Sequence, residues 1–170
     1  MKRMHNMSRE ILSNNIFNEE KYQVFVLSSP CSIPINLFVH TWFVVNNKGT
    51  VSRYEVLLRR NQPSTIPGYV HIDHWYKNVF PTIRGMAMFY PGRKFVWTPK
   101  LLGFIESDEN GLAHTIAKCI ENSEESYPYK NLYHFWGPNS NTYTAWILKK
   151  FPEFKVQLPW TAVGKNYTVK

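Results

Sequence analysis

The sequence lacks the features that would anchor the protein in a membrane or export it. No apolar run reaches the ~18 residues that a spanning helix needs. The N-terminus opens with Lys2 and Arg3 but contains no apolar segment of signal-peptide length. We therefore expect a cytoplasmic protein by default, with a polar lead-in over residues 1–20, a short helix over residues 8–17, and one domain over residues 21–170.

Cysteine is also scarce, because Cys31 and Cys119 are the only two and their separation matches no metal-ligand spacing. Sequence alone does not say whether they are bridged. The group formed by His71, Asp73 and His74 is too small and irregular to define a metal site. We therefore expect no metal and no cofactor. Cys31 is a weaker candidate nucleophile, with nothing nearby in the sequence to activate it.

Carboxylates are fewer than basic residues, 12 against 20, which gives a formal net charge of +8. Such a charge favours acidic partners. The basic residues are scattered in small pairs, however, so we do not expect nucleic acid. We interpret them mainly as solvated surface, and the alternative is a weak contact with an anionic surface on the side that carries Lys149, Lys150, Lys155 and Lys165.

The hydrophobic patterns predict an α+β fold, with a mostly antiparallel sheet packed on two or more helices. Apolar and β-branched runs predict strands over residues 22–28, 37–46, 50–58, 93–97 and 101–106. Helical periodicity predicts helices over residues 109–124, capped by Asp108, and 140–151. Residues 61–92 give no clear pattern, and residues 154–170 are expected to be extended chain.

The segment from Leu37 to Leu58 is predicted to form a hairpin that brings a polar group to a buried histidine. His40 is the one ionisable residue of the first strand, which is apolar on both faces. A two-residue loop would place Glu55 directly opposite His40, whereas a three-residue loop would place Val56 there and Tyr54 on the diagonal. Sequence does not choose between these registers.

The clearest helix start follows Gly137 and Pro138, where Asn139, Ser140, Asn141 and Thr142 stand in a row. Their short polar side chains can accept from the unpaired N–H groups of a first helical turn. The simplest interpretation is that they only cap the helix. The alternative is that Ser140 uses the positive end of the helix dipole as an anion or nucleophile site.

Two stretches carry a family resemblance. The sequence YPYKNLYHFWGPNSNTYTAWILKKFPEFKVQLPWTAVGKNY resembles the C-terminal signature of a bacterial domain family of unknown function, and HTWFVVN with SRYEV resembles its N-terminal hairpin. Tyr143 stands where that family usually has phenylalanine, and Thr41 and Trp160 stand where it often has proline. The resemblance implies no established activity.

A more distant resemblance concerns chemistry. The order of a strand histidine, a polar residue in the next strand and a nucleophile at a later helix start is similar to permuted papain-like proteins, including the lecithin:retinol acyltransferase group and NlpC-like folds. Asn139-Ser140 would match their Asn-Cys pair, although a serine hydroxyl is far less acidic than a thiol. The resemblance implies Ser140 as nucleophile, His40 as general base and Glu55 or Tyr54 as the orienting group.

Two functions therefore stay open, and the sequence does not say whether the protein is an enzyme. The first is a hydrolase or acyltransferase acting on an amide or ester. The second is a catalytically silent binding domain for a peptide, a lipid or a small-molecule ligand. The residues expected to contact the ligand in either case are Trp42, Tyr54, His134, Trp136, Asn139, Asn141 and Thr142.

Overall fold

A five-stranded antiparallel sheet organises the chain, with its strands in the order β4-β3-β2-β1-β7. The computed structural model describes residues 16–31, 37–58, 70–73, 85, 87–90, 93–129 and 132–168. The strands are β1 (Tyr22–Pro30), β2 (Val39–Asn47), β3 (Thr50–Leu58), β4 (Val70–Asp73) and β7 (Lys100–Ser107), and a separate two-stranded sheet contains β5 (Ala87–Tyr90) and β6 (Arg93–Val96). Most of the predicted helix over residues 8–17 lies outside the described residues.

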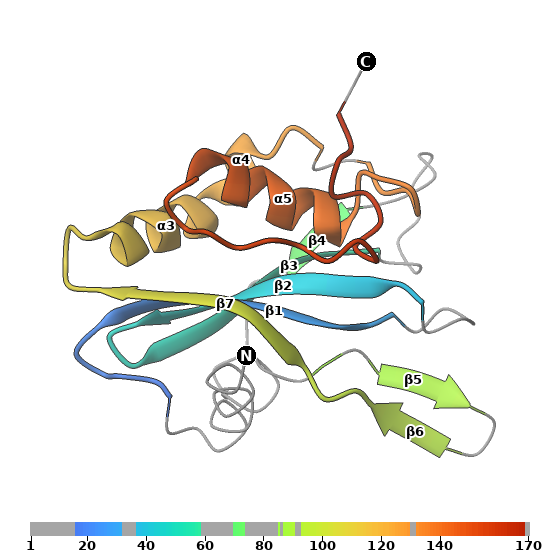
Figure 1. Ribbon diagram of the computed structural model, residues 1–170, viewed down its shortest axis with the longest axis horizontal. Helices are drawn as coiled ribbons and strands as arrows, with labels where there is room; N and C mark the ends of the chain where they lie inside the picture. The colour runs from blue at the N-terminus through green and yellow to red at the C-terminus, as the bar shows by residue number, and fades with distance from the viewer. Residues whose placement is uncertain are drawn as a thin grey trace.

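Helices of the described part of the chain cover one face of this sheet, as Figure 1 shows. They are α3 (Leu112–Glu121), α4 (Ser123–Ser126) and α5 (Ser140–Lys150). The predicted α+β fold is therefore confirmed. None of the helices in the described part of the chain is long and apolar enough to cross a bilayer.

The β2–β3 hairpin turns at Lys48 and Gly49, which both have positive φ, and Asn47 pairs with Thr50. This two-residue turn begins one residue later than the sequence suggested. It pairs Phe43 with Tyr54, so continuing the register places Glu55 opposite Trp42. Neither predicted register is therefore correct. Positive φ at both central residues suits the right-handed twist of the two strands, which accounts for the observed turn.

The helix predicted after Asp108 begins later than expected and is capped by a different residue. The backbone N–H groups of Ala113 and His114 donate to Oγ of Ser107, at 3.1 and 3.4 Å. Asp108 instead pairs with Nζ of Lys21 at 2.6 Å. The predicted Asp108 cap is thus wrong, because α3 begins only at Leu112, with Gly111 at the N-cap position.

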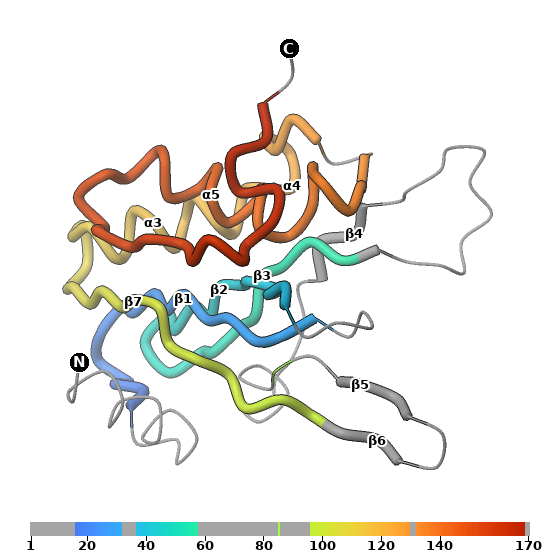
Figure 2. The backbone as a smooth tube through the Cα atoms, turned by 45° about the vertical axis from the view of Figure 1, so that its right-hand side comes forward, coloured from blue at the N-terminus to red at the C-terminus, as the bar shows by residue number. Residues whose placement is uncertain are grey.

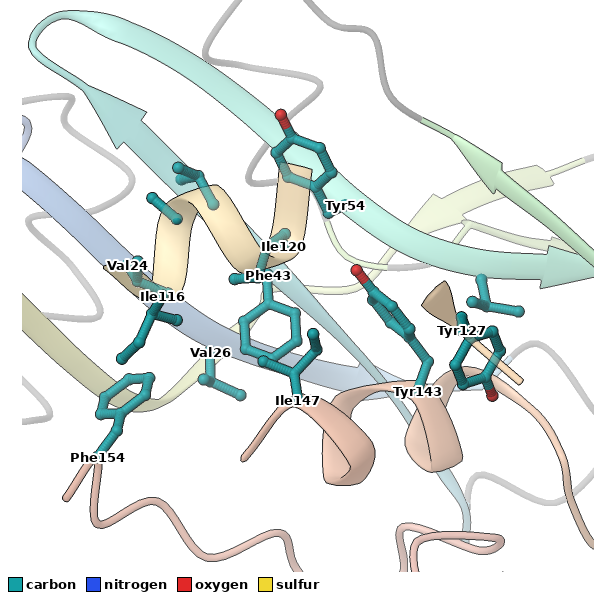
Figure 3. Close-up of a cluster of buried hydrophobic side chains, with 13 residues drawn as sticks. Val24, Val26, Phe43, Tyr54, Ile116, Ile120, Tyr127, Tyr143, Ile147 and Phe154 are labelled. Carbon is teal, nitrogen blue, oxygen red and sulfur yellow. The ribbon is translucent and has the colours of Figure 1, made fainter. Parts of the chain in front are cut away.

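The main core lies between the helices and the sheet (Figure 3). Alternate strand residues such as Val24, Val26 and Phe43 point toward Ile116 of α3 and Ile147 of α5. The intervening strand residues form a second cluster on the other face of the sheet, with members Phe25, Leu27, Trp42, Val44, Val51 and Leu101. The sheet is therefore apolar on both faces.

After α5 the chain runs back alongside the helical layer (Figures 1 and 2). This segment, residues 151–168, forms turns and irregular chain without a strand. Val156 fits against Gly103 of β7, where an added Cβ would lie 2.3 Å from its Cγ2. The backbone N–H of Val39 donates to the carbonyl of Thr161 at 3.2 Å. These contacts join the segment to both β7 and β2.

Candidate functional site

Helix α5 begins at a capping box built from the polar run that the sequence singled out. Asn139 is the N-cap, and its Oδ1 accepts hydrogen bonds from the backbone N–H groups of Asn141 at 3.0 Å and Thr142 at 3.2 Å. The hydroxyl of Thr142 accepts in turn from the backbone N–H of Asn139 at 3.1 Å. These bonds satisfy N–H groups that a helix leaves unpaired at its start, so the capping prediction is confirmed.

The amide nitrogens of the same side chains hold three loops together. Nδ2 of Asn139 donates to the carbonyls of Phe135 at 2.8 Å and Val163 at 3.1 Å. Nδ2 of Asn141 donates to the carbonyls of Val39 and Val163, both at 2.9 Å. Both asparagines are buried, where an unpaired carbonyl would be costly. We call the side chains of Asn139 and Asn141 the amide clamp.

Gly164 lets its loop approach the amide clamp closely, and Gly137 lets the loop before α5 approach Tyr167. Gly164 has φ +87°, and a Cβ there would lie 2.5 Å from Nδ2 of Asn139. Its carbonyl accepts from the hydroxyl of Thr142 at 2.7 Å. Gly137 has φ +110°, and a Cβ there would lie 2.7 Å from Cβ of Tyr167. Only glycine fits these positions without strain.

The strand residue that contacts the start of α5 is Thr41. Its hydroxyl lies 2.9 Å from Oδ1 of Asn141 and 2.9 Å from Oγ1 of Thr144. Two residues along, Phe43 packs against Tyr143 of α5, with ring centroids 6.0 Å apart. Successive strand side chains point to opposite faces, so His40 lies on the sheet face turned away from α5.

On that far face, His40 belongs to a buried ionic group. Its Nε2 lies 2.5 Å from Oε2 of Glu55 and donates to it, since an ionised carboxylate only accepts. Arg53 contacts both oxygens of the same carboxylate, Nη2 to Oε2 at 2.7 Å and Nε to Oε1 at 2.5 Å. The guanidinium also lies 4.4 Å from the ring centroid of Trp42. All four residues are buried.

The electrostatics of this group keep the carboxylate charged. Burial alone would raise the pKa of Glu55, but the charge of Arg53 and the hydrogen bond from His40 outweigh it and lower the pKa to about 2. The indole Nε1 of Trp42 is buried without a hydrogen-bond partner among the described residues. Burial and these contacts make the group a buried ionic group on the sheet face opposite to α5.

The structure brings together only part of the predicted serine mechanism. His40 and Glu55 are in contact, as expected. Ser140 is 3% exposed and opens α5 on the other side of the sheet. Among the described residues, no hydrogen bond joins its hydroxyl to His40. The single crevice that the residue order predicted is therefore not formed by these side chains.

The predicted ligand contacts also fall in different places. Trp42 lies under the sheet, whereas Tyr54 lies in the core on the helix side, where burial raises its pKa to about 12. His134 and Trp136 are exposed on the loop before α5. Asn139, Asn141 and Thr142 are occupied by the contacts described above. These residues do not line one pocket.

The large apolar side chains that are exposed in the described part of the chain come from segments that meet near the start of α5. They are Leu37 (56% exposed), Leu132 (38%), Phe135 (37%), Trp136 (71%) and Trp160 (83%). The rings of Phe38 and Phe135 meet edge to face at 5.1 Å. The bond from Val39 to Thr161 places Trp160 beside the same loops. We call these five exposed side chains the aromatic end.

Sequence reasoning found only Trp136 of the aromatic end. Leu132 and Phe135 lie on the same loop as Trp136, whereas Leu37 and Trp160 lie on loops distant in sequence, and no hydrophobic period marks these residues. The available signal was the GPN and LPWTAVG context, in which large apolar side chains alternate with glycine and proline. Trp136 and Trp160 stand in these two contexts, on separate loops, and both are exposed.

Cysteine and metal chemistry find no support at this end of the molecule. Both cysteines are free, and burial raises the pKa of the Cys31 thiol to about 11. A nucleophilic thiol needs the opposite shift. Among the described residues, no group of three or more metal-binding side chains occurs. The side chains of His71, Asp73 and His74 lie outside the described residues.

Fold and site together define an α+β domain in which buried amides hold loops that expose aromatic side chains. The chain belongs to the DUF3750 family, described as proteins of unknown function, whose model matches residues 22–167. The expected membership of an uncharacterised domain family is thus confirmed. Neither the curated proteins nor the solved structures gave a match to the chain. The likeness to permuted papain-like proteins stays a prediction.

Proposed function

We propose that this protein is a binding domain without catalytic activity, which docks its aromatic end on an anionic lipid bilayer. The observation that carries the proposal is the aromatic end itself. Its five exposed side chains come from three segments, which are held together by contacts that include the amide clamp, the Val39–Thr161 bond and the Phe38–Phe135 ring contact. Buried polar bonds that hold apolar side chains in water point to a surface prepared for a partner.

The chemistry of this surface suits the bilayer interface. Trp136 and Trp160 combine a large apolar ring with an N–H donor, and such side chains concentrate at the headgroup level of membranes. They project from loops, so the rings can enter the interface while the fold stays intact. A peptide groove would instead bury its anchors in a pocket, and neither tryptophan has one here: they are 71% and 83% exposed.

Charge favours an anionic surface over a neutral one. From residue 127 to the last residue, the sequence has a single carboxylate, Glu153, together with Lys130, Lys149, Lys150, Lys155, Lys165 and Lys170. The described ion pairs that involve surface lysines join Lys21 to Asp108 and Lys48 to Glu109, both outside this stretch. Each lysine near an anionic leaflet contributes about 1 kcal/mol.

The serine hydrolase remains a prediction from residue order, and the orientation of the strand argues against it. A serine nucleophile needs a base within hydrogen-bond reach. The β2 side chain that contacts the start of α5 is that of Thr41, which has a hydroxyl and no basic nitrogen. The side chain of His40 lies on the opposite face of the sheet and is hydrogen-bonded to Glu55. The helix start is also occupied by its own capping box.

Vesicle sedimentation tests the proposal. Wild-type protein should bind vesicles of phosphatidylcholine and phosphatidylglycerol in equal parts, bind pure phosphatidylcholine more weakly, and lose affinity as salt rises. The Trp136→Ser/Trp160→Ser double variant should bind about tenfold more weakly. The Trp136→Phe/Trp160→Phe variant is the matched control and should keep most of the affinity.

Two outcomes contradict the proposal. Wild-type protein that stays in the supernatant with both vesicle types rules out membrane docking, and a double serine variant that binds like wild type rules out the aromatic end. Catalysis is tested separately with a fluorophosphonate probe. If the probe labels the wild-type protein but not Ser140→Ala, the protein is a serine hydrolase and the binding proposal is wrong.

A further inference from the structure

An open groove lies between α5 and the returning C-terminal segment, which Figures 1 and 2 show running beside that helix. Its volume is about 390 Å³, enough for a small ligand. Its lining residues are Ala145, Leu148, Lys149, Val156, Gln157, Leu158, Lys165 and Asn166. None of the residues discussed as a catalytic candidate contributes to it.

The groove combines an apolar wall with two cationic groups. Lys149 comes from α5 and Lys165 from the C-terminal segment, and the lining contains no carboxylate. Among the described residues, neither lysine forms an ion pair. The groove is therefore positive without a counter-charge from the residues that line it. Two lysines on separate elements can approach one anion from two directions.

One of the two ammonium groups is held in place before any ligand binds. Nζ of Lys165 donates to the carbonyls of Leu158 at 2.9 Å and Pro159 at 3.0 Å. An ammonium has three N–H donors, so one remains for a ligand. Fixing this side chain in advance removes part of the entropy cost of binding. Lys149 is exposed and can move to meet the same anion.

We propose that this groove binds the phosphate group of an anionic phospholipid, with the glycerol and first acyl carbons against its apolar wall. The inference rests on the proposed membrane docking for the source of the ligand. Leu158 lines the groove and Trp160 follows two residues later, so a lipid in the groove would lie beside the aromatic end. A bare phosphate ion would use the lysines but leave the apolar wall unused.

Short-chain lipids below their micelle concentration test the groove without a bilayer. Binding is followed through the NMR shifts of the amide groups of Gln157 and Asn166. Dihexanoyl phosphatidic acid should bind more tightly than dihexanoyl phosphatidylcholine and than inorganic phosphate. Lys149→Gln should weaken the phosphatidic acid complex about fivefold, whereas Lys155→Gln, a lysine outside the groove, should leave it unchanged.

Three results would overturn the inference. Inorganic phosphate that binds as tightly as phosphatidic acid identifies a simple anion site. Equal losses of affinity for phosphatidic acid in Lys149→Gln and Lys155→Gln show that the overall positive charge, and not the groove, attracts the lipid. Full binding by Ala145→Phe, which fills the groove, places the ligand elsewhere.

The tryptophan variants separate this inference from the proposed function. Trp136→Ser/Trp160→Ser should bind vesicles about tenfold more weakly and keep the soluble lipid complex, because neither tryptophan lines the groove. A wild-type protein that binds soluble phosphatidic acid but no vesicles would refute membrane docking and leave the groove site standing. A wild-type protein that binds vesicles but not soluble phosphatidic acid would refute the groove site and leave membrane docking standing.

Discussion

The imidazole of His40 and the carboxylate of Glu55 meet at 2.5 Å on the sheet face opposite to α5. The neighbouring residue, Thr41, takes the position beside the helix start where a base would have to stand. The His40–Glu55 pair thus has a structural position in the sheet and not a catalytic position beside Ser140. Its consequences are expected in stability rather than in turnover.

Replacing Glu55 by glutamine should lower the free energy of unfolding at pH 7 by about 3 kcal/mol, because it removes the buried carboxylate that both Arg53 and His40 contact. Urea unfolding measures this. The exposed Glu125, on α4, provides the control, since Glu125→Gln should change stability by less than about 0.5 kcal/mol.

The same variant should alter the acid dependence of stability. The folded-state pKa of Glu55, about 2, lies below its ordinary value of 4.5. A lowered pKa contributes stability that is present above the unfolded value and is lost as the pH falls through the folded value. The difference between wild type and Glu55→Gln should therefore shrink between pH 4.5 and 2. A difference that stays constant over this range contradicts the assignment.

Variants of Asn139 separate two roles of its side chain, which are to cap α5 through Oδ1 and to hold the loops through Nδ2. Asn139→Ala should lower the free energy of unfolding by about 2 kcal/mol, through loss of the cap and of the bonds to Phe135 and Val163. Asn139→Asp keeps the accepting oxygen for the helix N–H groups but removes both donors. Urea unfolding of the aspartate variant should show no recovery. Near wild-type stability would mean that Asn139 only caps the helix.

Gly164 and Gly49 form a matched pair with φ of +87° and +92°. Gly49→Ala should cost about 1 kcal/mol, the usual penalty for a left-handed alanine. Gly164→Ala should cost about 2 kcal/mol more, because its Cβ would overlap Asn139, whereas the nearest atom to a Cβ at Gly49 is 3.5 Å away. Thermal unfolding compares the stability of the two variants. Equal losses of stability would show that the close approach of Gly164 to Asn139 does not contribute to the cost of the substitution.

Thr41 should matter through its hydroxyl. Thr41→Val keeps the shape but removes the hydroxyl that lies against Oδ1 of Asn141 and Oγ1 of Thr144, of which Thr144 keeps its bond to the carbonyl of Ser140, so stability should fall by about 1–2 kcal/mol. Thr41→Ser retains the hydroxyl and should lose less. If both variants unfold at the same urea concentration, the hydroxyl does not tie the sheet to α5.

Local patterns were sufficient for much of the fold. The start of α5 was predictable because a capping box uses only residues within four positions of each other. The strands β1, β2 and β3 were predictable from their β-branched and aromatic runs. The short strands β4 and β5 lie where proline and glycine interrupt every pattern, and sequence did not reveal them.

The candidate site was predicted less well. The contact of His40 with Glu55 was expected, but by a register that the structure does not have, since the turn falls at Lys48 and Gly49. The donors of the amide clamp could not be anticipated, because their partners Val39 and Val163 lie about a hundred and about twenty residues away.

By itself the sequence determined the layers, the helix start, the excess of lysine near the C-terminus and the family, since each depends on composition or on neighbours along the chain. Only the tertiary structure decided which face of β2 meets α5. Both faces of that strand are apolar, so nothing in its pattern distinguishes Thr41 from His40 as the partner of the helix. The aromatic end likewise exists only in the folded molecule, because hydrogen bonds between distant loops bring its side chains together.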